Sequence, residues 1–321
     1  MNRGNESTVP EFFLLGFSNL KKLQLLLFPI FFLAYIVILI SNISIMTAIT
    51  VTWSLHTPMY FFLFALSFSE LCSTFVIIPK TLVNLLVEKK TISVIGCATQ
   101  MFGGFGFGAI NCFLLTVMAY DRYVAICHPL QYSAMMNRKV CIQLVTISCV
   151  TGFLISLTIN SLVFSLPLCG PRTIGHFFCD VKPVLRLACG AIYLAEIVVV
   201  SLCAFVIVGT FTVIIISYTY ILSAILKIHS VAGRCKTFST CSSHLTVVVT
   251  HYGCASFVYL RPKSSSSLDE DTLISVGYLL LTPCLNPMIY SLRNKEVKFA
   301  LKKLVLNSLC FFLKKVKGGH L

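Results

Sequence analysis

The chain has 321 residues, of which 57% are hydrophobic and only 11% are charged, and its mean hydropathy is +0.90. Soluble domains carry about 25% charged residues, so these charges are too few to cover a water-soluble globule. A disordered chain is excluded as well, because such chains are short of apolar residues. The protein must therefore present most of its surface to lipid. Its net charge of +14 is explained by basic residues that set the orientation in the membrane and contact lipid headgroups. We therefore expect no nucleic-acid partner.

Long uncharged stretches separate the few charges, and a membrane helix needs roughly 20 apolar residues. The first stretch is divided at Trp53–Pro58, because proline cannot continue a helix but fits its first turn. The pattern predicts an all-α membrane protein, a bundle of seven transmembrane helices. The expected spans are about 24–51, 58–80, 95–121, 140–162, 195–226, 237–260 and 272–292.

The charge distribution sets the expected topology: an extracellular N-terminus at 1–23, a membrane domain at 24–292 and a cytoplasmic helix and tail at 293–321. The inner set then holds 14 basic and 2 acidic residues, a net charge of +12. The outer set holds 11 basic and 8 acidic residues, a net charge of +3, and Glu70 lies within the bilayer. This asymmetry agrees with the positive-inside rule. The sequon at Asn5 would then be available for glycosylation outside the cell.

Four of the 15 cysteines fall on the expected outer side: Cys97, Cys169, Cys179 and Cys189. An even number in an oxidising compartment indicates two disulfides. Four cysteines allow three connectivities, which spacing alone does not distinguish, and the alternative is that some stay free. Most of the others fall inside spans, where a free thiol behaves as a small apolar side chain.

Ionisable residues occur at two places within or at the end of the expected membrane spans. Ionisable residues inside a membrane are functional candidates. Glu70 lies in the middle of the second span. It could stay neutral, hold a cation, or hydrogen-bond to Asn111 and Asn286 if the second, third and seventh helices meet. The second place is Asp121-Arg122-Tyr123 at the inner end of the third span, for which ordinary interfacial charge is the alternative explanation.

Asp-Arg-Tyr is one of several motifs that occur in a fixed order along nearly the whole chain. They read LHTPMYFFL at 55–63, MAYDRYVAICHPLQY at 118–132, SY at 217–218, KTFSTCSSHL at 236–245 and PCLNPMIYSLRN at 283–294. Together they resemble the signature of vertebrate olfactory receptors, a branch of the rhodopsin-like (class A) G-protein-coupled receptors. The long outer loop with three cysteines resembles the class II branch.

The resemblance implies specific disulfides and signalling roles. The bridges would be Cys97–Cys179 and Cys169–Cys189. An arginine at the position of Arg122 meets the G protein once the sixth helix swings outward, and Asp121 would hold it at rest. The coupling and activation residues implied are Asp121, Arg122, Tyr123, Tyr218, Lys236, His244, Asn286, Pro287 and Tyr290. Proline in a membrane helix can also be a passive kink.

After the seventh span, basic residues from Arg293 to Lys303 alternate with apolar ones, namely Leu292, Val297, Leu301 and Leu304. This pattern indicates a short amphipathic eighth helix on the inner membrane face, where it would contact lipids. A merely basic, solvated tail is the alternative. Cys310 could be palmitoylated or remain a plain thiol.

The chain departs from the family at the position of a common cation site. Glu70 stands where the second helix more often carries Asp, and Asn111 stands where the third helix often carries Glu. One carboxylate remains of the usual two. We expect no cofactor and no firm metal site, and at most weak sodium binding by Glu70, Asn111 and Asn286.

The resemblance also implies a ligand pocket between the third, fifth, sixth and seventh helices. Distance from the motifs gives Gly104, Phe105, Gly108, Ala109, Cys112, Leu202, Cys203, Val206, Tyr252, Ala255, Ser256, Tyr259, Val276 and Leu279. The glycines of 103–108 could serve helix packing or make room for a ligand. No charged residue is expected to face this set, so the expected ligand is small, volatile and mostly neutral.

Two other classes fit less well. A transporter would show inverted repeats or broken helices, and a membrane enzyme would show motifs such as His-Glu-x-x-His or Gly-x-Ser-x-Gly; neither pattern is visible. We therefore expect that the protein is not an enzyme. We expect an odorant receptor of the plasma membrane that activates a stimulatory olfactory-type G protein and raises cyclic AMP.

Overall fold

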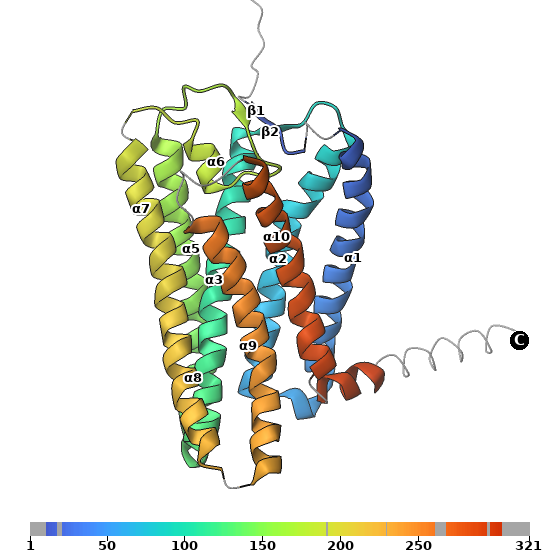
Figure 1. Ribbon diagram of the computed structural model, residues 1–321, viewed down its shortest axis with the longest axis vertical. Coiled ribbons are helices and arrows are strands. Elements are labelled where there is room, and N and C mark those ends of the chain that lie inside the picture. The colour runs from blue at the N-terminus through green and yellow to red at the C-terminus, as the bar shows by residue number, and fades with distance from the viewer. Residues whose placement is uncertain are drawn as a thin grey trace, which may run out of the picture.

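The computed structural model describes residues 11–17, 21–190, 192–228, 230–260, 268–293 and 296–303. Within these residues, seven long helical segments run side by side, as Figure 1 shows. The prediction of an all-α, seven-helix membrane bundle is confirmed. The segments are α1 (Lys21–Val51), α2 (Pro58–Leu86), α3 (Val94–Cys127), α5 (Arg138–Ser165), α7 with α8 (Ile192–Ala204 and Thr210–Leu226), α9 (Val231–Tyr259) and α10 (Leu268–Arg293).

Five segments of the described chain are long and apolar enough to cross a membrane: Gln24–Val51, Pro58–Leu86, Val94–Cys127, Arg138–Ser165 and Ile192–Leu226. The α10 helix has a shorter apolar part, Ile274–Tyr290. The α9 helix spans 29 residues but is more polar. Two of its polar side chains, His244 and His251, are buried inside the bundle, so they do not have to face lipid.

Several helices extend past the spans expected from charge. The α2 helix runs to Leu86 and α3 runs to Cys127, while α9 begins at Val231. The expected spans ended near charged residues, but a helix ends where its backbone groups find other partners. Ser93 and Ser230 cap the N-terminal ends of α3 and α9. Their hydroxyls accept hydrogen bonds from backbone amides of these helices at 3.0 and 2.9 Å.

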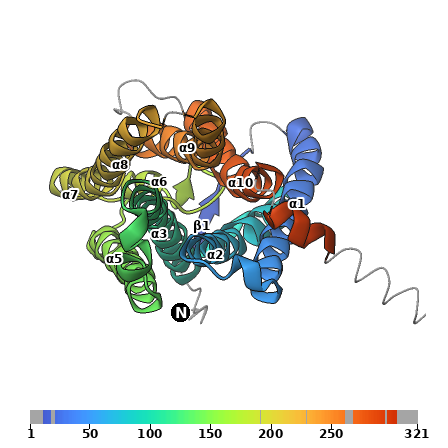
Figure 2. The same cartoon turned by 90° about the horizontal axis from the view of Figure 1, so that it is seen from below.

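The α3 helix occupies the middle of the bundle and packs against α2, α5, α8 and α9 (Figure 2). Glycines permit the closest approaches. A Cβ atom at Gly152 of α5 would lie 2.6 Å from Ile110 Cγ1, and one at Gly106 would lie 2.9 Å from Phe153 Cδ1. Gly103 is similarly close to Val76. Gly103 and Gly106, two glycines of the 103–108 run, therefore permit close packing of α3 against its neighbours.

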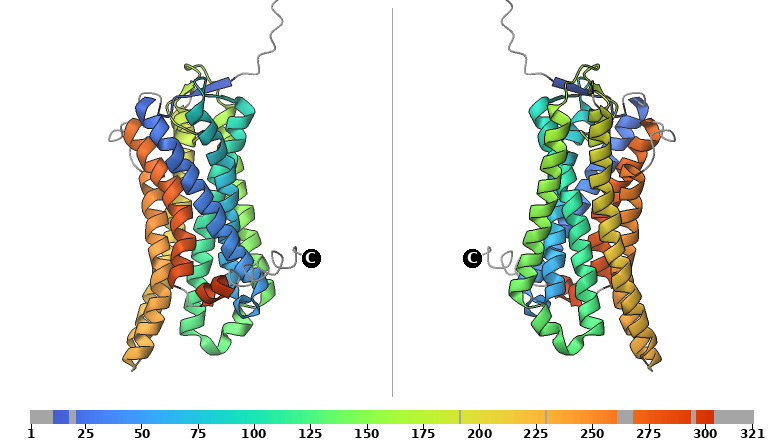
Figure 3. Two further views of the ribbon diagram at one scale, coloured as in Figure 1. Left: turned by 90° about the vertical axis from the view of Figure 1, so that its right-hand side faces the viewer. Right: turned by 90° about the vertical axis from the view of Figure 1, so that its left-hand side faces the viewer.

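A small sheet, which the sequence did not predict, closes one end of the bundle (Figure 3). The central strand β1 (Glu11–Leu14) pairs antiparallel with β2 (Thr91–Ser93) and parallel with β3 (Thr173–Ile174). We call this the sheet end. The loop that carries β3 continues into a short helix, α6 (Val181–Leu185). The N-terminal segment is thereby joined to the loop that covers the helices.

The opposite end carries Arg122, and we call it the Arg122 end. It holds the short helices η1 (Trp53–Leu55), η2 (Pro129–Gln131) and α4 (Tyr132–Met135). Residues 296–303 form a further helical segment, drawn in dark red in Figure 3. Val297 and Ala300 are buried there while the lysines are exposed, which is the predicted amphipathic pattern. Asn5, Leu304 and Cys310 lie outside the described residues.

Candidate ligand cavities and signalling site

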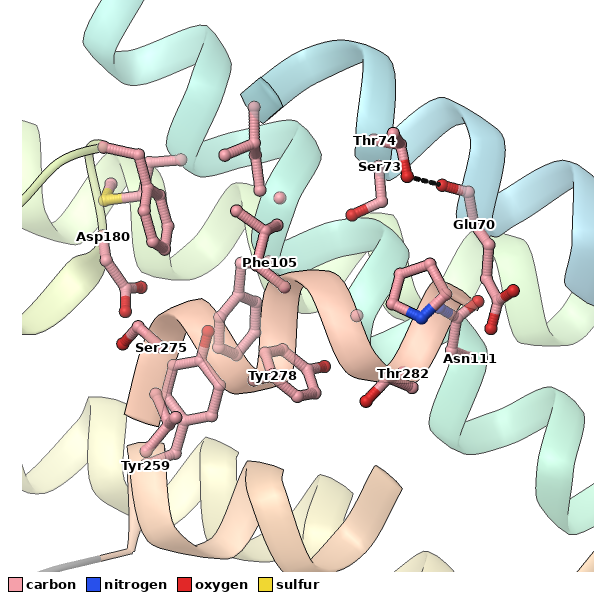
Figure 4. Close-up of a pocket in the computed structure, with 18 of the residues that line it drawn as sticks. Glu70, Ser73, Thr74, Phe105, Asn111, Asp180, Tyr259, Ser275, Tyr278 and Thr282 are labelled. Atoms are coloured by element: carbon pink, nitrogen blue, oxygen red, sulfur yellow. Dashed lines mark hydrogen bonds between the residues drawn. The ribbon is translucent and has the colours of Figure 1, made fainter. Parts of the chain in front are cut away.

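A cavity of about 670 Å³, here called the deep cavity, lies among α2, α3, α9 and α10 beneath the loop that follows β3. Figure 4 shows Asp180, Tyr259 and Ser275 toward one end and Glu70, Asn111 and Thr282 toward the other. Aromatic rings line the space between them. The lining residues are Glu70, Ser73, Thr74, Ile77, Met101, Gly104, Phe105, Gly108, Asn111, Phe178, Cys179, Asp180, His251, Val258, Tyr259, Ser275, Tyr278, Leu279, Thr282 and Pro283.

A second hollow of about 340 Å³, here called the side cavity, adjoins the deep cavity toward α7. It lies beside η3 (Phe205–Gly209), a π-helical turn that joins α7 to α8. Four residues line both cavities: Phe105, Gly108, Tyr259 and Tyr278. The side cavity is additionally lined by Ala109, Cys112, Cys203, Val206, Ile207 and Ala255. Its lining is almost wholly apolar, which suits an apolar ligand.

The structure places most of the predicted ligand residues on these two hollows. Gly104, Phe105, Gly108, Tyr259 and Leu279 line the deep cavity. Ala109, Cys112, Cys203, Val206 and Ala255 line the side cavity.

The other predicted ligand residues, Leu202, Tyr252, Ser256 and Val276, line neither hollow. The Tyr252 hydroxyl donates to Thr210 Oγ1 at 2.7 Å and to the Cys112 carbonyl at 3.1 Å, so it joins α9 to α8 and α3. Leu202 and Val276 pack against buried apolar clusters. Leu202, Tyr252 and Val276 therefore serve helix packing.

The expectation that no charged residue faces the ligand site is wrong. Two acidic residues, Glu70 and Asp180, line the deep cavity. Sequence reasoning also missed Ser275 and Tyr278, although both follow the helical spacing of Leu279 and Thr282 along one face of α10. It missed Phe178 and Asp180, although both flank Cys179, which was expected to tie the loop over the bundle.

Two disulfides fix the loop over the cavities. Cys97 is bonded to Cys179, with Cα atoms 5.3 Å apart, and Cys169 to Cys189, with Cα atoms 5.9 Å apart. These are the pairs that the resemblance implied. Gln100 adds a further tie from α3, because its Oε1 accepts a hydrogen bond from the Cys179 backbone amide at 2.9 Å. The loop is thus held to the sheet end of α3 by a covalent bond and a hydrogen bond.

The loop buries two titratable groups at the sheet end. Burial raises the pKa of Asp180 above its usual range, although the Val181 amide donates to Oδ1 at 2.7 Å and Tyr259 hydrogen-bonds to the same group. Burial lowers the pKa of His176 to about 3. The His176 ring lies 4.6 Å from the rings of both Phe177 and Phe178. The loop therefore favours an uncharged imidazole and disfavours the charged form of Asp180.

At the other end of the deep cavity, Glu70 and Asn111 line the hollow, and Asn286 contacts Glu70 from α10. The Asn286 Nδ2 of α10 donates a hydrogen bond to Glu70 Oε1 of α2. The remaining oxygens, Glu70 Oε2, Asn111 Oδ1 and Asn286 Oδ1, are buried and have no hydrogen-bond partner among the described residues. Three acceptors without donors form a chemically suitable set for a hard cation such as sodium.

Known proteins identify the architecture. A family model described as olfactory receptor matches residues 31–308. Human olfactory receptor 10T2 is 54% identical over 302 residues, which cover 94% of this chain and 96% of the relative. Human olfactory receptor 10K2 is 53% identical over 95% of this chain and 98% of its own. The chain belongs to the olfactory receptor family. It is therefore a multi-pass membrane receptor and not an enzyme, in a family that binds small odorants and couples to G proteins.

In this olfactory receptor, the Asp121 side chain has a different partner from the one expected. We expected Asp121 to hold Arg122. Instead, the Tyr132 hydroxyl of α4 donates to Asp121 Oδ1 at 2.8 Å, and the Arg122 guanidinium contacts Met59 Sδ at the start of α2. Asp121 is therefore used to fix the α4 segment to α3.

Other predicted signalling residues lie close to Arg122 at this end of the receptor. The hydroxyl of Tyr218 on α8 lies 2.8 Å from Nδ1 of His244 on α9. Tyr290 of α10 is buried, and its hydroxyl has no hydrogen-bond partner among the described residues. Pro287 lies inside α10 next to Asn286. The Tyr123 hydroxyl lies 3.0 Å from Nε2 of His128. The Lys236 side chain lies outside the part of the receptor that the structure describes.

Proposed function

We propose that this olfactory receptor detects small, mostly neutral volatile molecules in the deep and side cavities and activates a stimulatory olfactory-type G protein, raising cyclic AMP. The observation that carries the proposal is a pair of adjoining, largely apolar cavities beneath a disulfide-anchored loop, at the far end of the bundle from Arg122. Such enclosed, mostly apolar hollows with a few polar groups are typical of small-molecule sites.

The cavity chemistry favours neutral ligands with a single polar group. Ser275 and Tyr278 offer hydroxyls within the deep cavity, while the side cavity offers apolar surface. A carboxylate ligand is disfavoured, because Glu70 and Asp180 would repel it if charged. Both acidic groups already accept hydrogen bonds, from Asn286 and from the Val181 amide, so a cationic ligand is not required. A panel in which only amines or carboxylates produced a response would overturn this assignment.

The mechanism we propose is a shift in population. An odorant that binds the active bundle more tightly than the resting one moves the equilibrium by that difference in affinity alone. The α9 helix would move away from α3, and the G protein would enter beside Arg122. Tyr218 and Tyr290 would then turn toward the guanidinium, and Asn286 with Pro287 would act as a hinge in α10.

The deciding experiment measures cyclic AMP in cells that express the receptor with the stimulatory olfactory-type G protein. A broad odorant panel should contain molecules that raise cyclic AMP. Arg122→Ala should abolish that response, while Arg138→Ala, an exposed arginine at the same end, should keep it. Surface expression of each variant is measured in parallel. A full response of Arg122→Ala at equal surface expression would refute the proposed role.

We also propose that the receptor lies in the plasma membrane with its sheet end outside and its Arg122 end in the cytoplasm. The greater positive charge of the Arg122 side supports this orientation. An N-terminal epitope should be accessible to antibody on intact cells, and a C-terminal epitope only after permeabilisation. Asn5→Gln should remove a glycosidase-sensitive mobility shift. The reverse pattern of epitope access would contradict the orientation.

A weak sodium site is a further part of the proposal. The residues that would hold the ion are Glu70, Asn111 and Asn286, whose unpartnered buried oxygens support it. Sodium should raise the melting temperature of the purified receptor and lower its basal signalling, and choline at the same ionic strength should do neither. Glu70→Gln should remove both effects. If neither basal signalling nor the melting temperature changed with sodium or with the substitution, the site would be excluded.

A further inference from the structure

A third hollow, here called the lateral cleft, lies on the side of the bundle between α6, α7 and the end of α9. Its volume, including space that is open to the surroundings, is about 970 Å³, larger than that of the deep cavity. Figure 1 shows α6 near the upper ends of α7 and α9. The cleft is lined by Val181, Lys182, Leu185, Arg186, Glu196, Val199, Val200, Cys203, Tyr259 and Leu260.

The α7 wall of the cleft is one face of the helix. Glu196, Val199, Val200 and Cys203 recur at the spacing that places side chains in a row. Val199 and Cys203 are buried, whereas Val200 is 48% exposed. Exposed apolar side chains of this helix must face lipid, so the mouth of the cleft opens toward the membrane at Val200.

The charged groups of the cleft come from two elements. Lys182 and Arg186 belong to α6 and its end, and Glu196 lies near the start of α7; Lys182 Nζ donates to the Val258 carbonyl of α9 at 2.7 Å. Below them the lining is apolar. A hollow with charged groups near the membrane surface and an apolar body fits an aliphatic molecule that partitions into the bilayer with its polar group toward the headgroups.

The cleft shares two residues with the receptor's interior. Cys203 and Tyr259 line both the lateral cleft and the side cavity, and Tyr259 also lines the deep cavity. The Tyr259 ring lies edge-on to Phe105, with centroids 5.7 Å apart. Cys203 and Tyr259 therefore lie between the cleft and the side cavity, and a passage between the two hollows requires the Tyr259 ring to move away from Phe105.

The backbone next to Cys203 is irregular. The π-helical turn η3 begins two residues after Cys203, and its Val206 and Ile207 line the side cavity. A π-turn holds an extra residue within the helix and is frequent at functional sites. By contrast, the route along the bundle axis is covered by the sheet and by the loop, where Phe177 and Phe178 are buried.

We propose that the lateral cleft is an entrance from the membrane, through which uncharged aliphatic molecules dissolved in the leaflet at the sheet end reach the side and deep cavities past Cys203 and Tyr259. This inference rests on the proposed function, because it assumes that the two cavities hold the ligand. It adds a route and a ligand class, namely molecules that partition into lipid before they bind.

Photolabelling of the full-length receptor in phosphatidylcholine nanodiscs tests the route. The probe is decanol with a diazirine on its chain, and mass spectrometry maps the adducts after increasing times of exposure. We expect early adducts on the cleft peptide that contains Val199 and later adducts on side-cavity residues such as Ala109 and Val206. Diazirinyl butanol, which is soluble in water, serves as the comparison probe.

Matched variants close or widen the mouth. Val200→Trp should slow the appearance of side-cavity adducts severalfold for the decanol probe and leave the butanol probe less affected. Ile197→Trp is the control, because Ile197 is 44% exposed on the same helix but does not line the cleft. Val200→Ala should accelerate labelling and decides the matter if the tryptophan variant does not fold.

Three results would overturn the entrance: equal labelling rates in Val200→Trp and the unmodified receptor, an equal loss in both tryptophan variants, or no acceleration in Val200→Ala. The experiment needs no odorant and no G protein. A receptor that is silent in the cyclic AMP assay but shows the expected labelling would therefore contradict the proposed function and leave the route intact.

Discussion

The Tyr218 hydroxyl and His244 Nδ1, on neighbouring helices, form a hydrogen bond of 2.8 Å beside Arg122. His244 Nε2 lies 3.1 Å from the Leu115 carbonyl. A carbonyl oxygen can only accept, so Nε2 carries the proton and Nδ1 accepts from the tyrosine. One imidazole thus ties α9 to α8 and to α3, the helix from which α9 moves away in the proposed activation.

His244→Phe should therefore raise basal cyclic AMP. Each lost hydrogen bond is worth about 1 kcal/mol, or about fivefold in the equilibrium between resting and active bundles. The measurement is signalling without odorant, normalised to surface expression. Thr246→Val is the control, because Thr246 is exposed on α9 and its hydroxyl donates to the Ser242 carbonyl of its own helix. An unchanged basal level, or an equal rise in the control, would contradict the assignment.

How far the sequence predicts this structure depends on how local each feature is. The helices follow from long uncharged stretches, since any apolar run of that length in lipid satisfies its backbone groups as a helix. Strand β1 could not be predicted, because four residues carry little pattern and its partners lie about 80 and 160 positions away. The disulfide pairing came from the family resemblance, since spacing alone allowed three connectivities.

The ligand cavities show the same limit. Along one helix the spacing is fixed, so Gly104, Phe105 and Gly108 could be placed together on α3. The rotation of a helix about its axis is set by packing, however. On α10 the cavity face carries Ser275, Tyr278 and Leu279, whereas Val276 packs against the buried apolar cluster that includes Leu279 and does not line the cavity. Glu70 is absent from the ligand residues predicted from the sequence, because the contact of α2 with the cavity is a tertiary feature.

His176 predicts a pH dependence of stability. Its folded-state pKa of about 3 lies below the ordinary value of 6.5, so the unfolded chain binds more protons between these pH values. Stability should be fully present above pH 6.5 and should fall as the pH drops toward 3. At pH 5 the loss is roughly 2 kcal/mol.

His176→Phe should flatten this dependence, because the aromatic surroundings accept a ring that cannot be protonated. The melting temperature of the purified receptor is measured from pH 7.5 to pH 5. His56→Phe, which replaces an exposed histidine, should keep the original slope. If His176→Phe and the unmodified receptor lose stability in parallel, another group is responsible.

Gly152 predicts a steric limit on the contact between α5 and α3. A Cβ atom there would lie 2.6 Å from Ile110 Cγ1, 3.1 Å from the Ile110 amide nitrogen and 3.2 Å from the Gly106 carbonyl oxygen, and backbone atoms cannot move aside. Gly152→Ala should cost about 1–3 kcal/mol of stability, as overpacking does. The readouts are melting temperature and surface expression, both of which should fall. Gly253→Ala on α9 is the control, because nothing lies within 4 Å of its added Cβ, and it should be neutral or stabilising.

The side cavity predicts different outcomes for two neighbouring residues of α9. Ala255 is buried and lines this cavity, whereas Ser256 lines neither cavity. Ala255→Leu should place its side chain in the space that a ligand would use, so the concentration for half-maximal cyclic AMP response should rise about tenfold or more, equivalent to at least about 1.4 kcal/mol. Ser256→Leu adds similar bulk outside the cavities and should leave the response to the same odorants nearly unchanged. Equal surface expression of both variants is required, because a folding defect would lower the maximal response. If Ser256→Leu weakened the response as much as Ala255→Leu, the ligand would have to contact the part of α9 that carries Ser256 as well.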